Sequence, residues 1–151
     1  MEELVDLLLK HKYTISMAES CTGGLLAACI VSIPDASKVF EQSFVTYTEE
    51  AKIKYAHVKD ETIKKYGVVS EEVALEMAKG VKKESKSNVG IGITGYAGPT
   101  GDNVGLVCFG LAINNDSYAY EMWFKGSRND IRSEAVEFII RKTIEKLKEI
   151  S

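Results

Sequence analysis

Histidine is almost absent from this chain of 151 residues, and its scarcity restricts the chemistry that the protein can perform. His11 and His57 are the only two, and neither lies in a metal-binding pattern such as H-E-x-x-H. We therefore expect no metal site and no Ser-His-Asp triad. Any nucleophile must be activated in another way, by a lysine, a tyrosine or the amide groups at the start of a helix.

Proline, cysteine and long apolar runs are also scarce. The two prolines, Pro34 and Pro99, form no linker, and we expect one domain over residues 1–151. The three cysteines are an odd number without metal-ligand spacing, which predicts reduced thiols and a cytoplasmic location. No apolar run approaches the roughly 18 residues that span a bilayer. The acids in the opening segment MEELVDLLLK argue against a secretion signal.

A charge excess of one sign is missing as well. The chain has 19 Lys and Arg residues against 22 Asp and Glu residues, which gives a net charge of −3 at pH 7. This balance creates no field that would attract polyanions, so we expect no general binding to nucleic acid or to a membrane surface. A local basic site for a single anion is compatible with it.

Helix-like and strand-like segments alternate along the chain. This order favours an α/β fold, a three-layer α/β/α sandwich around a mixed central sheet. Helices are expected at 2–10, 24–32, 49–56, 60–66, from Ser70 to about Lys83 and in a last helix capped by Asn129, and strands at 14–18, 39–46, 89–94, 105–113 and 117–124.

A turn of polar and small residues, Glu19-Ser20-Cys21-Thr22-Gly23-Gly24, connects the first expected strand to a helix. Such a turn places a hydroxyl at the carboxyl edge of the sheet, where open α/β sheets bind ligands. Free amide groups at the helix start could hold an anion or an oxyanion. Alternatively, Ser20 or Thr22 only caps the helix. Cys21 is a second candidate nucleophile, because the start of a helix lowers the pKa of a thiol. The alternative is that Cys21 is a buried, inert residue.

Tyr47 and Lys52 follow the second expected strand and open a helix. Both could face one cleft, where the lysine lowers the pKa of the phenol or serves as a base. The alternative is a pair of surface side chains with solvated tips.

Further along, the loop Gly92-Ile93-Thr94-Gly95-Tyr96-Ala97-Gly98 is interpreted as a turn that faces a ligand, because its glycines allow close backbone approach.

Two arginines, Arg128 and Arg132, lie near the start of the last helix. Arginine can bind a phosphate with two parallel hydrogen bonds, so a phosphate site is one interpretation. The other is that both are surface residues that pair with Asp130 or Glu134.

Taken in order, these segments resemble the CinA C-terminal domain family, which includes the nicotinamide-nucleotide amidohydrolases. The resemblance covers nearly the whole chain, and the combination of A-E-S-C-T-G-G with T-G-x-A-G-P is highly specific. The matching segments are 18–24, 45–47 with Ala51-Lys52, 67–70 with Met77-Ala78, 94–101 and 126–132.

The resemblance implies hydrolysis of the carboxamide of nicotinamide mononucleotide (NMN) to nicotinic acid mononucleotide and ammonia, without a cofactor. Ser20 is then the nucleophile, and Tyr47 and Lys52 relay its proton to the leaving ammonia. The expected partner is this small pyridine nucleotide, and the expected assembly is a homo-oligomer. The implied substrate-binding residues are Cys21, Thr22, Gly23, Thr94, Gly95, Ala97, Gly98, Arg128 and Arg132.

The chain departs from the family pattern in three places. Glu41-Gln42-Ser43 stands where glycines are usual, Tyr96 replaces an aliphatic residue, and the stretch after Gly101 is shortened to Asp102-Asn103-Val104. These changes concern the substrate pocket more than the chemistry. Two alternatives stay open: a nucleotide-binding or regulatory module with weak or no turnover, and a hydrolase that uses Cys21.

Overall fold

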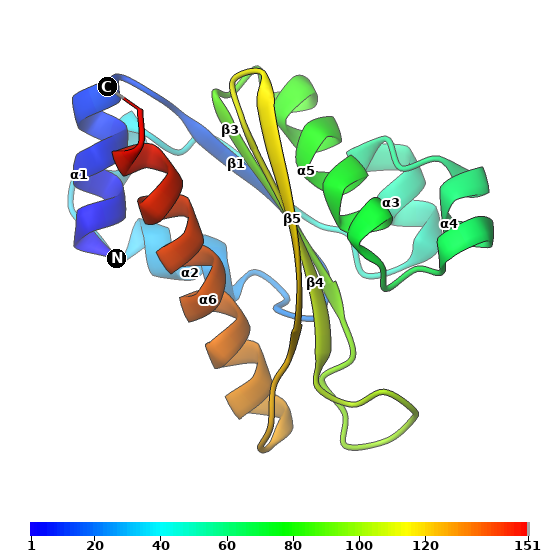
Figure 1. Ribbon diagram of the computed structural model, residues 1–151. Helices are drawn as coiled ribbons and strands as arrows, with labels where there is room; N and C mark the ends of the chain where they lie inside the picture. Colours follow the sequence, from blue (N-terminus) through cyan, green and yellow to red (C-terminus); the bar gives the residue numbers. More distant parts are fainter. Residues whose placement is uncertain (151) are drawn as a thin grey trace.

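A five-stranded mixed sheet forms the centre of the computed structural model, which describes residues 1–150. The strands lie in the order β2-β1-β3-β4-β5 (Figure 1). β1 pairs in parallel with β2 and β3, whereas β4 pairs antiparallel with β3 and β5. The mixed sheet predicted from the sequence is therefore confirmed. The strands are β1 Ile15–Glu19, β2 Phe44–Val45, β3 Val89–Gly95, β4 Leu106–Ile113 and β5 Asp116–Trp123.

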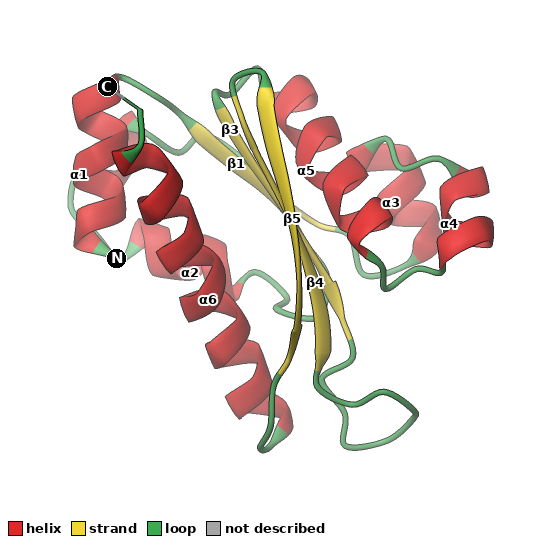
Figure 2. Cartoon of the chain, in the orientation of Figure 1, coloured by secondary structure: helices red, strands yellow, loops and turns green. Residues whose placement is uncertain are grey.

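Helices cover both faces of this sheet (Figure 2), as the three-layer prediction requires. One face carries α1 (Glu2–His11), α2 (Leu25–Val31) and α6 (Arg128–Lys148). The other carries α3 (Glu49–Ala56), α4 (Asp60–Tyr66) and α5 (Glu71–Ser85). A short 3₁₀ helix covers Ala36–Lys38. No helix among residues 1–150 has both the length and the apolar character needed to cross a bilayer.

The central strands are buried on both faces, which explains why they read as continuous apolar runs. Every residue of β1 and β4 is buried. Helix α5 packs closely on β3 and β4 because glycines stand at the contact positions of these strands, where a side chain would keep the helix away. A Cβ at Gly92 or at Gly110 would lie 2.2 Å from the carbonyl O of Ala74 in α5, so neither position accepts a larger residue.

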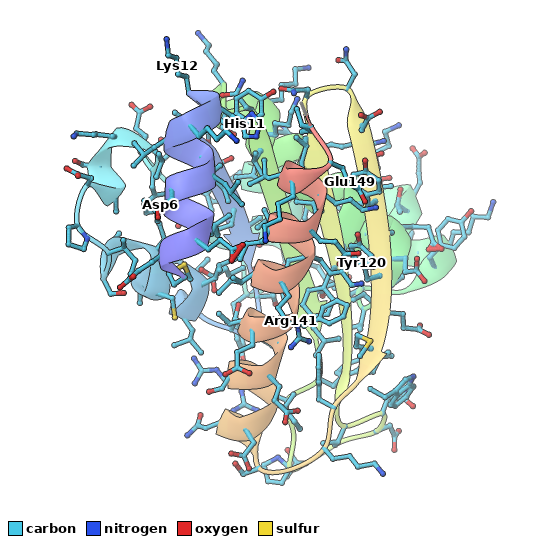
Figure 3. The ribbon with its side chains drawn as sticks, turned by 60° about the vertical axis from the view of Figure 1, so that its left-hand side comes forward. Asp6, His11, Lys12, Tyr120, Arg141 and Glu149 are labelled. Carbon is cyan, nitrogen blue, oxygen red and sulfur yellow. The ribbon has the colours of Figure 1, made fainter. Side chains whose placement is uncertain are left out.

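Aromatic packing holds α6 against the face of the sheet opposite to α5. Figure 3 shows Tyr120 of β5 and Arg141 of α6 on this side of the sheet. The ring of Phe138 lies 4.9 Å from that of Phe109 in β4 and 5.7 Å from that of Tyr120 in β5, measured between centroids. The guanidinium carbon of Arg141 lies 6.0 Å from the centroid of Phe138. The contacts of the Phe138 ring fix α6, whose first two turns carry Arg128 and Arg132.

The strand expected at 39–46 is mostly wrong. Phe40 forms only an isolated bridge to Ile15, and regular pairing is limited to Phe44 and Val45 of β2. The polar stretch Glu41-Gln42-Ser43 between them has low strand propensity and lies at the edge of the sheet, where only one neighbour could support it.

Of the two predicted helix caps, one is confirmed and the other is wrong. Ser70 caps α5, since its hydroxyl accepts the amide N–H of Val73 at 3.2 Å. Asn129, however, is not the cap of α6. Ser127 and Asp130 form a reciprocal capping box, in which each side chain accepts the backbone N–H of the other. This arrangement satisfies two amide groups instead of one.

Candidate active site

The carboxyl ends of the three parallel strands meet at one edge of the sheet and open onto a cavity. Ser20 directly follows β1, Tyr47 follows β2, and Thr94 lies at the end of β3. The cavity measures about 440 Å³, and these three residues line it together with Lys52 and Arg128. The position agrees with the general rule that open α/β sheets bind ligands at such edges.

Lys52 and Ser20 form a buried hydrogen-bonded pair in this cavity. The Nζ atom of Lys52 donates to Ser20 Oγ at 3.0 Å and to the carbonyl O of Thr46 at 2.8 Å. The lysine is only 2% exposed. The hydroxyl of Thr48 accepts the amide N–H of Ala51 and so starts α3, which carries Lys52 into the cavity. The interpretation of Lys52 as a solvated surface lysine is therefore wrong.

The surroundings of Lys52 lower the pKa of its side chain. Burial lowers the pKa of the ammonium group because the charged form loses its hydration, while the nearby Cys21 and Glu49 partly oppose this shift. Among residues 1–150, no carboxylate forms an ion pair with Lys52. A lysine with a lowered pKa that contacts a hydroxyl has the arrangement of a general base beside a nucleophile.

Tyr47 lines the same cavity but is bonded to a different partner. Its hydroxyl accepts a hydrogen bond from Nη2 of Arg128 at 3.0 Å, and the tyrosine is 58% exposed. Arg128 also donates through Nη1 to the carbonyl O of Gly98. The structure therefore pairs Tyr47 with Arg128, and no hydrogen bond joins Tyr47 to Ser20 or Lys52. Arg128 connects the two loops that border the cavity.

Arg132 faces the turn behind Ser20. Its Nε and Nη2 atoms donate to the carbonyl oxygens of Cys21 and Thr22, both at 2.9 Å, and Nη1 donates to Asn129 Oδ1 at 3.0 Å. It is not among the residues that line the cavity. Asp130 forms no ion pair with it, because that carboxylate caps α6. Arg132 thus bonds mainly to backbone carbonyl groups, whereas the sequence suggested either a phosphate or a surface carboxylate as its partner.

Glu19 is the residue whose place in this site sequence reasoning missed. Its side chain is 0% exposed, and Oε1 accepts the hydroxyl of Thr22 at 2.6 Å together with the amides of Gly24 and Leu26 at 3.2 and 3.0 Å. Oε2 accepts the amide of Ala27 at 3.0 Å. The amide groups expected to hold an anion are therefore occupied by this carboxylate. A buried acid just before a helix start was the available signal, since such a group needs donors.

Cys21 has the properties of an inert thiol. It lines the cavity but is only 5% exposed. Burial raises its pKa to about 11, and the positive charges of Arg132 and Lys52 only partly offset this effect. Because the thiolate is the reactive form, this environment disfavours Cys21 as a nucleophile.

The predicted ligand-facing loop does border the cavity. Gly95, Tyr96, Ala97 and Gly98 line it, and Tyr96 is partly exposed there. The hydroxyl of Thr94 donates to the carbonyl O of Val68 at 3.0 Å, which ties the end of β3 to the segment before α5.

Among the described residues, no three His, Cys, Asp or Glu side chains cluster in a way that could hold a metal ion.

Thr22 and Gly23 shape the turn rather than the cavity. The hydroxyl of Thr22 donates to Glu19, so it does not cap α2. Gly23 has a φ of +57°, in the left-handed region, and a Cβ there would lie 3.4 Å from Nη2 of Arg132. Both residues are absent from the cavity lining, so the structure does not place them against a ligand.

Known proteins share both the sequence and the fold. Residues 1–147 match the family described as the CinA C-terminal domain. A CinA-like protein of Kosmotoga olearia is 47% identical over 143 residues, which cover 92% of this chain and 35% of that protein. A crystal structure of the competence damage-inducible protein A from Klebsiella pneumoniae has a TM-score of 0.95 at 29% identity, over 99% of this chain and 96% of that one.

A third comparison agrees. A CinA superfamily protein from Escherichia coli has a TM-score of 0.88 at 36% identity and covers 91% of this chain and 83% of that one. This chain spans 34–37% of the length of the first curated relatives that it matches. The matched region nevertheless contains Ser20, Lys52 and every other residue that lines the cavity. The chain therefore belongs to the CinA C-terminal domain family.

Proposed function

We propose that the protein hydrolyses the carboxamide of NMN to nicotinic acid mononucleotide and ammonia, with Ser20 as nucleophile and Lys52 as general base. The observation that carries the proposal is the buried hydrogen bond between Lys52 Nζ and Ser20 Oγ in the cavity. The family resemblance supplies the substrate, and the geometry of this pair supports the chemistry.

The first half of the reaction forms an acyl-enzyme. Neutral Lys52 takes the hydroxyl proton of Ser20 while Oγ bonds to the carboxamide carbon, which gives a tetrahedral oxyanion. The ammonium of Lys52 then gives this proton to the amide nitrogen, the C–N bond breaks and ammonia leaves. The bond from Lys52 to the carbonyl O of Thr46 holds Nζ beside Oγ throughout. In the neutral amine one N–H stays bonded to this carbonyl, and rotation about the Cε–Nζ bond can turn the lone pair toward Oγ.

The second half reverses these roles with water. Lys52 takes a proton from a water molecule, whose oxygen attacks the ester carbon on Ser20. Collapse of the second tetrahedral oxyanion breaks the bond to Oγ, and Lys52 returns the proton to Ser20. Nicotinic acid mononucleotide is released and the enzyme is restored.

Glu19 changes the expected source of oxyanion stabilisation. The amides of Gly24, Leu26 and Ala27 already donate to its carboxylate, so the start of α2 is not available. The amide of Cys21 directly follows the nucleophile and lies outside the set held by Glu19. We assign the oxyanion contact to this amide.

We assign the substrate phosphate to Arg128. It is the arginine that lines the cavity, whereas Arg132 donates to Cys21, Thr22 and Asn129. Its bonds to Tyr47 and Gly98 keep its guanidinium at the cavity border, where further N–H groups can meet an anion.

The burial of Lys52 favours an enzyme over a binding module without turnover. Desolvating an ammonium group costs free energy. Glu49 offsets only part of this cost, and among residues 1–150 no carboxylate lies within ion-pair distance of Lys52. A module that only binds a nucleotide has no use for a buried lysine whose contact is a serine hydroxyl. The raised pKa of Cys21 similarly disfavours a cysteine hydrolase.

Product analysis tests the proposal. The protein is incubated with NMN, and ammonia and nicotinic acid mononucleotide are measured in parallel. We expect both to form in equal amounts with the native protein and neither with Ser20→Ala, whose melting temperature should stay close to native. Absence of both products with the native protein, or equal turnover by Ser20→Ala, would contradict the proposal.

A further inference from the structure

The turn that carries Ser20 is held from two sides by charged residues that do not line the cavity. On one side, the buried carboxylate of Glu19 accepts the Thr22 hydroxyl and the amides of Gly24, Leu26 and Ala27. Its negative charge lies at the positive end of α2, which stabilises this part of the helix.

On the other side, Arg132 bonds the turn through its carbonyl groups. Nε donates to the carbonyl O of Cys21 and Nη2 to that of Thr22, at 2.9 Å each. One planar guanidinium thus fixes two consecutive peptide groups, a geometry that a lysine ammonium cannot reproduce. Arg132 is 110 and 111 residues distant along the chain from these partners, so α6 sets the position of the turn.

The turn needs such support because of its own composition. Gly23 and Gly24 have φ values of +57° and +97°, and glycine gives the backbone wide conformational freedom. Without external bonds, the segment after Ser20 could adopt several conformations. Each would place Oγ differently with respect to Lys52 Nζ, which is itself fixed by the carbonyl O of Thr46.

We propose that Glu19 and Arg132 are positioning residues that hold Ser20 Oγ in line with Lys52 and with the substrate carbon. This inference rests on the proposed function only in taking Ser20 as the nucleophile. Neither residue bonds to Lys52, so the pair governs where the nucleophile lies and leaves the ionisation of the base unchanged.

A covalent serine probe tests this inference without relying on NMN. A fluorophosphonate reacts with an activated serine hydroxyl, forming an O–P bond and releasing fluoride, and peptide mass spectrometry locates the product. The second-order labelling rate at Ser20 is measured against pH for native protein, Arg132→Ala, Arg132→Lys and Glu19→Gln. Arg141→Ala is the matched control, since it removes the same charge from the same helix away from the turn.

We expect the plateau rate of Arg132→Ala to fall by about tenfold to a hundredfold, because a displacement of about 1 Å can cost on the order of 100-fold. Arg132→Lys and Glu19→Gln should fall less, and Arg141→Ala should match native protein. The midpoint of the pH profile should stay in place for all of them. Millimolar guanidinium should restore part of the rate of Arg132→Ala, which a general loss of packing would not allow.

Two results would overturn the inference. One is a labelling rate in Arg132→Ala equal to that of native protein, when thermal unfolding shows that the variant is folded. The other is a shifted pH midpoint at an unchanged plateau, which would show that Arg132 acts on Lys52. If Arg132→Ala does not fold, either of these two results obtained with Arg132→Lys would overturn the inference. Labelling of native Ser20 without ammonia release from NMN would contradict the proposed substrate and leave this inference standing, whereas an unreactive native Ser20 would overturn both.

Discussion

Lys52 Nζ lies 3.0 Å from Ser20 Oγ and 2.8 Å from the carbonyl O of Thr46, and all three groups are buried. The backbone carbonyl fixes the lysine from one side, and the second group to which Nζ donates is the hydroxyl of Ser20. The pair joins the carboxyl end of β1 to helix α3, and it has the geometry that a lysine-activated serine requires.

Replacing the base should remove most of the activity without unfolding the protein. Lys52→Met keeps the length and volume of the buried side chain but cannot accept a proton. We expect kcat for NMN to fall by a factor of about 10² to 10⁴, the usual contribution of a general base. The melting temperature should not decrease, since an apolar group is cheaper to bury than an ammonium. Ammonia release and thermal unfolding measure the two effects, with the exposed Lys54→Met as control.

The pH dependence of activity follows from the same residue. Burial lowers the pKa of Lys52 below the ordinary lysine value of 10.5. Because only the neutral amine accepts the proton of Ser20, kcat/KM should rise with pH to a plateau with a midpoint below 10.5. Activity that instead falls with pH through this range would mean that Lys52 acts in its charged form.

Stability should depend on pH in the same direction. Between the lowered pKa of folded Lys52 and the value of 10.5 in the unfolded chain, the unfolded state binds more protons. The free energy of unfolding contributed by this residue should therefore rise with pH across that window. Urea unfolding at several pH values, compared with Lys52→Met, measures the difference, and identical pH slopes for both proteins would contradict the shift.

Cys21 should be dispensable for the chemistry. Its pKa of about 11 leaves little thiolate at neutral pH, and its side chain is almost fully covered. We expect Cys21→Ala to retain kcat within a fewfold of native, and iodoacetamide to inactivate the native protein slowly. Rapid inactivation by iodoacetamide, together with a dead but folded Cys21→Ala, would transfer the nucleophile to this residue.

Arg128 should distinguish the nucleotide from its nucleoside. In native protein, NMN should bind more tightly than nicotinamide riboside, which lacks the phosphate. Arg128→Ala should remove about 1.5–3 kcal/mol of this preference, the usual worth of a hydrogen bond to a charged group. Binding constants for both ligands and both proteins form a thermodynamic cycle. A preference equal to native in Arg128→Ala would place the phosphate elsewhere.

The layer arrangement and the cavity position could be predicted because they depend on local patterns. The turn from Glu19 to Gly24 follows a strand and precedes a helix, and Tyr47 follows a strand that runs parallel to it. Ser20 could therefore be placed at the carboxyl edge of the sheet, and Tyr47 with Lys52 at a cleft, whereas the pairing of Ser20 with Lys52 is implied only by the family resemblance.

The partners of the charged residues could not be predicted from spacing alone. Glu19 stands a few residues before the free amides at the start of α2, but its spacing does not show that its side chain accepts them. The partners of the two arginines depend on contacts between segments that are distant along the chain. Arg132 and Arg128 lie one helical turn apart, yet one meets the turn after β1 and the other meets Tyr47. Their different roles follow from the docking of α6, which no local pattern encodes.

Trapping the acyl-enzyme tests the central claim most directly. Native protein is mixed with NMN, quenched with acid within the first turnover and digested, and the peptides are analysed by mass spectrometry. The account predicts an ester on Ser20 that carries the pyridine mononucleotide without its amide nitrogen, and no such adduct in Ser20→Ala. An adduct on Cys21, or undiminished product formation by Ser20→Ala, would contradict it.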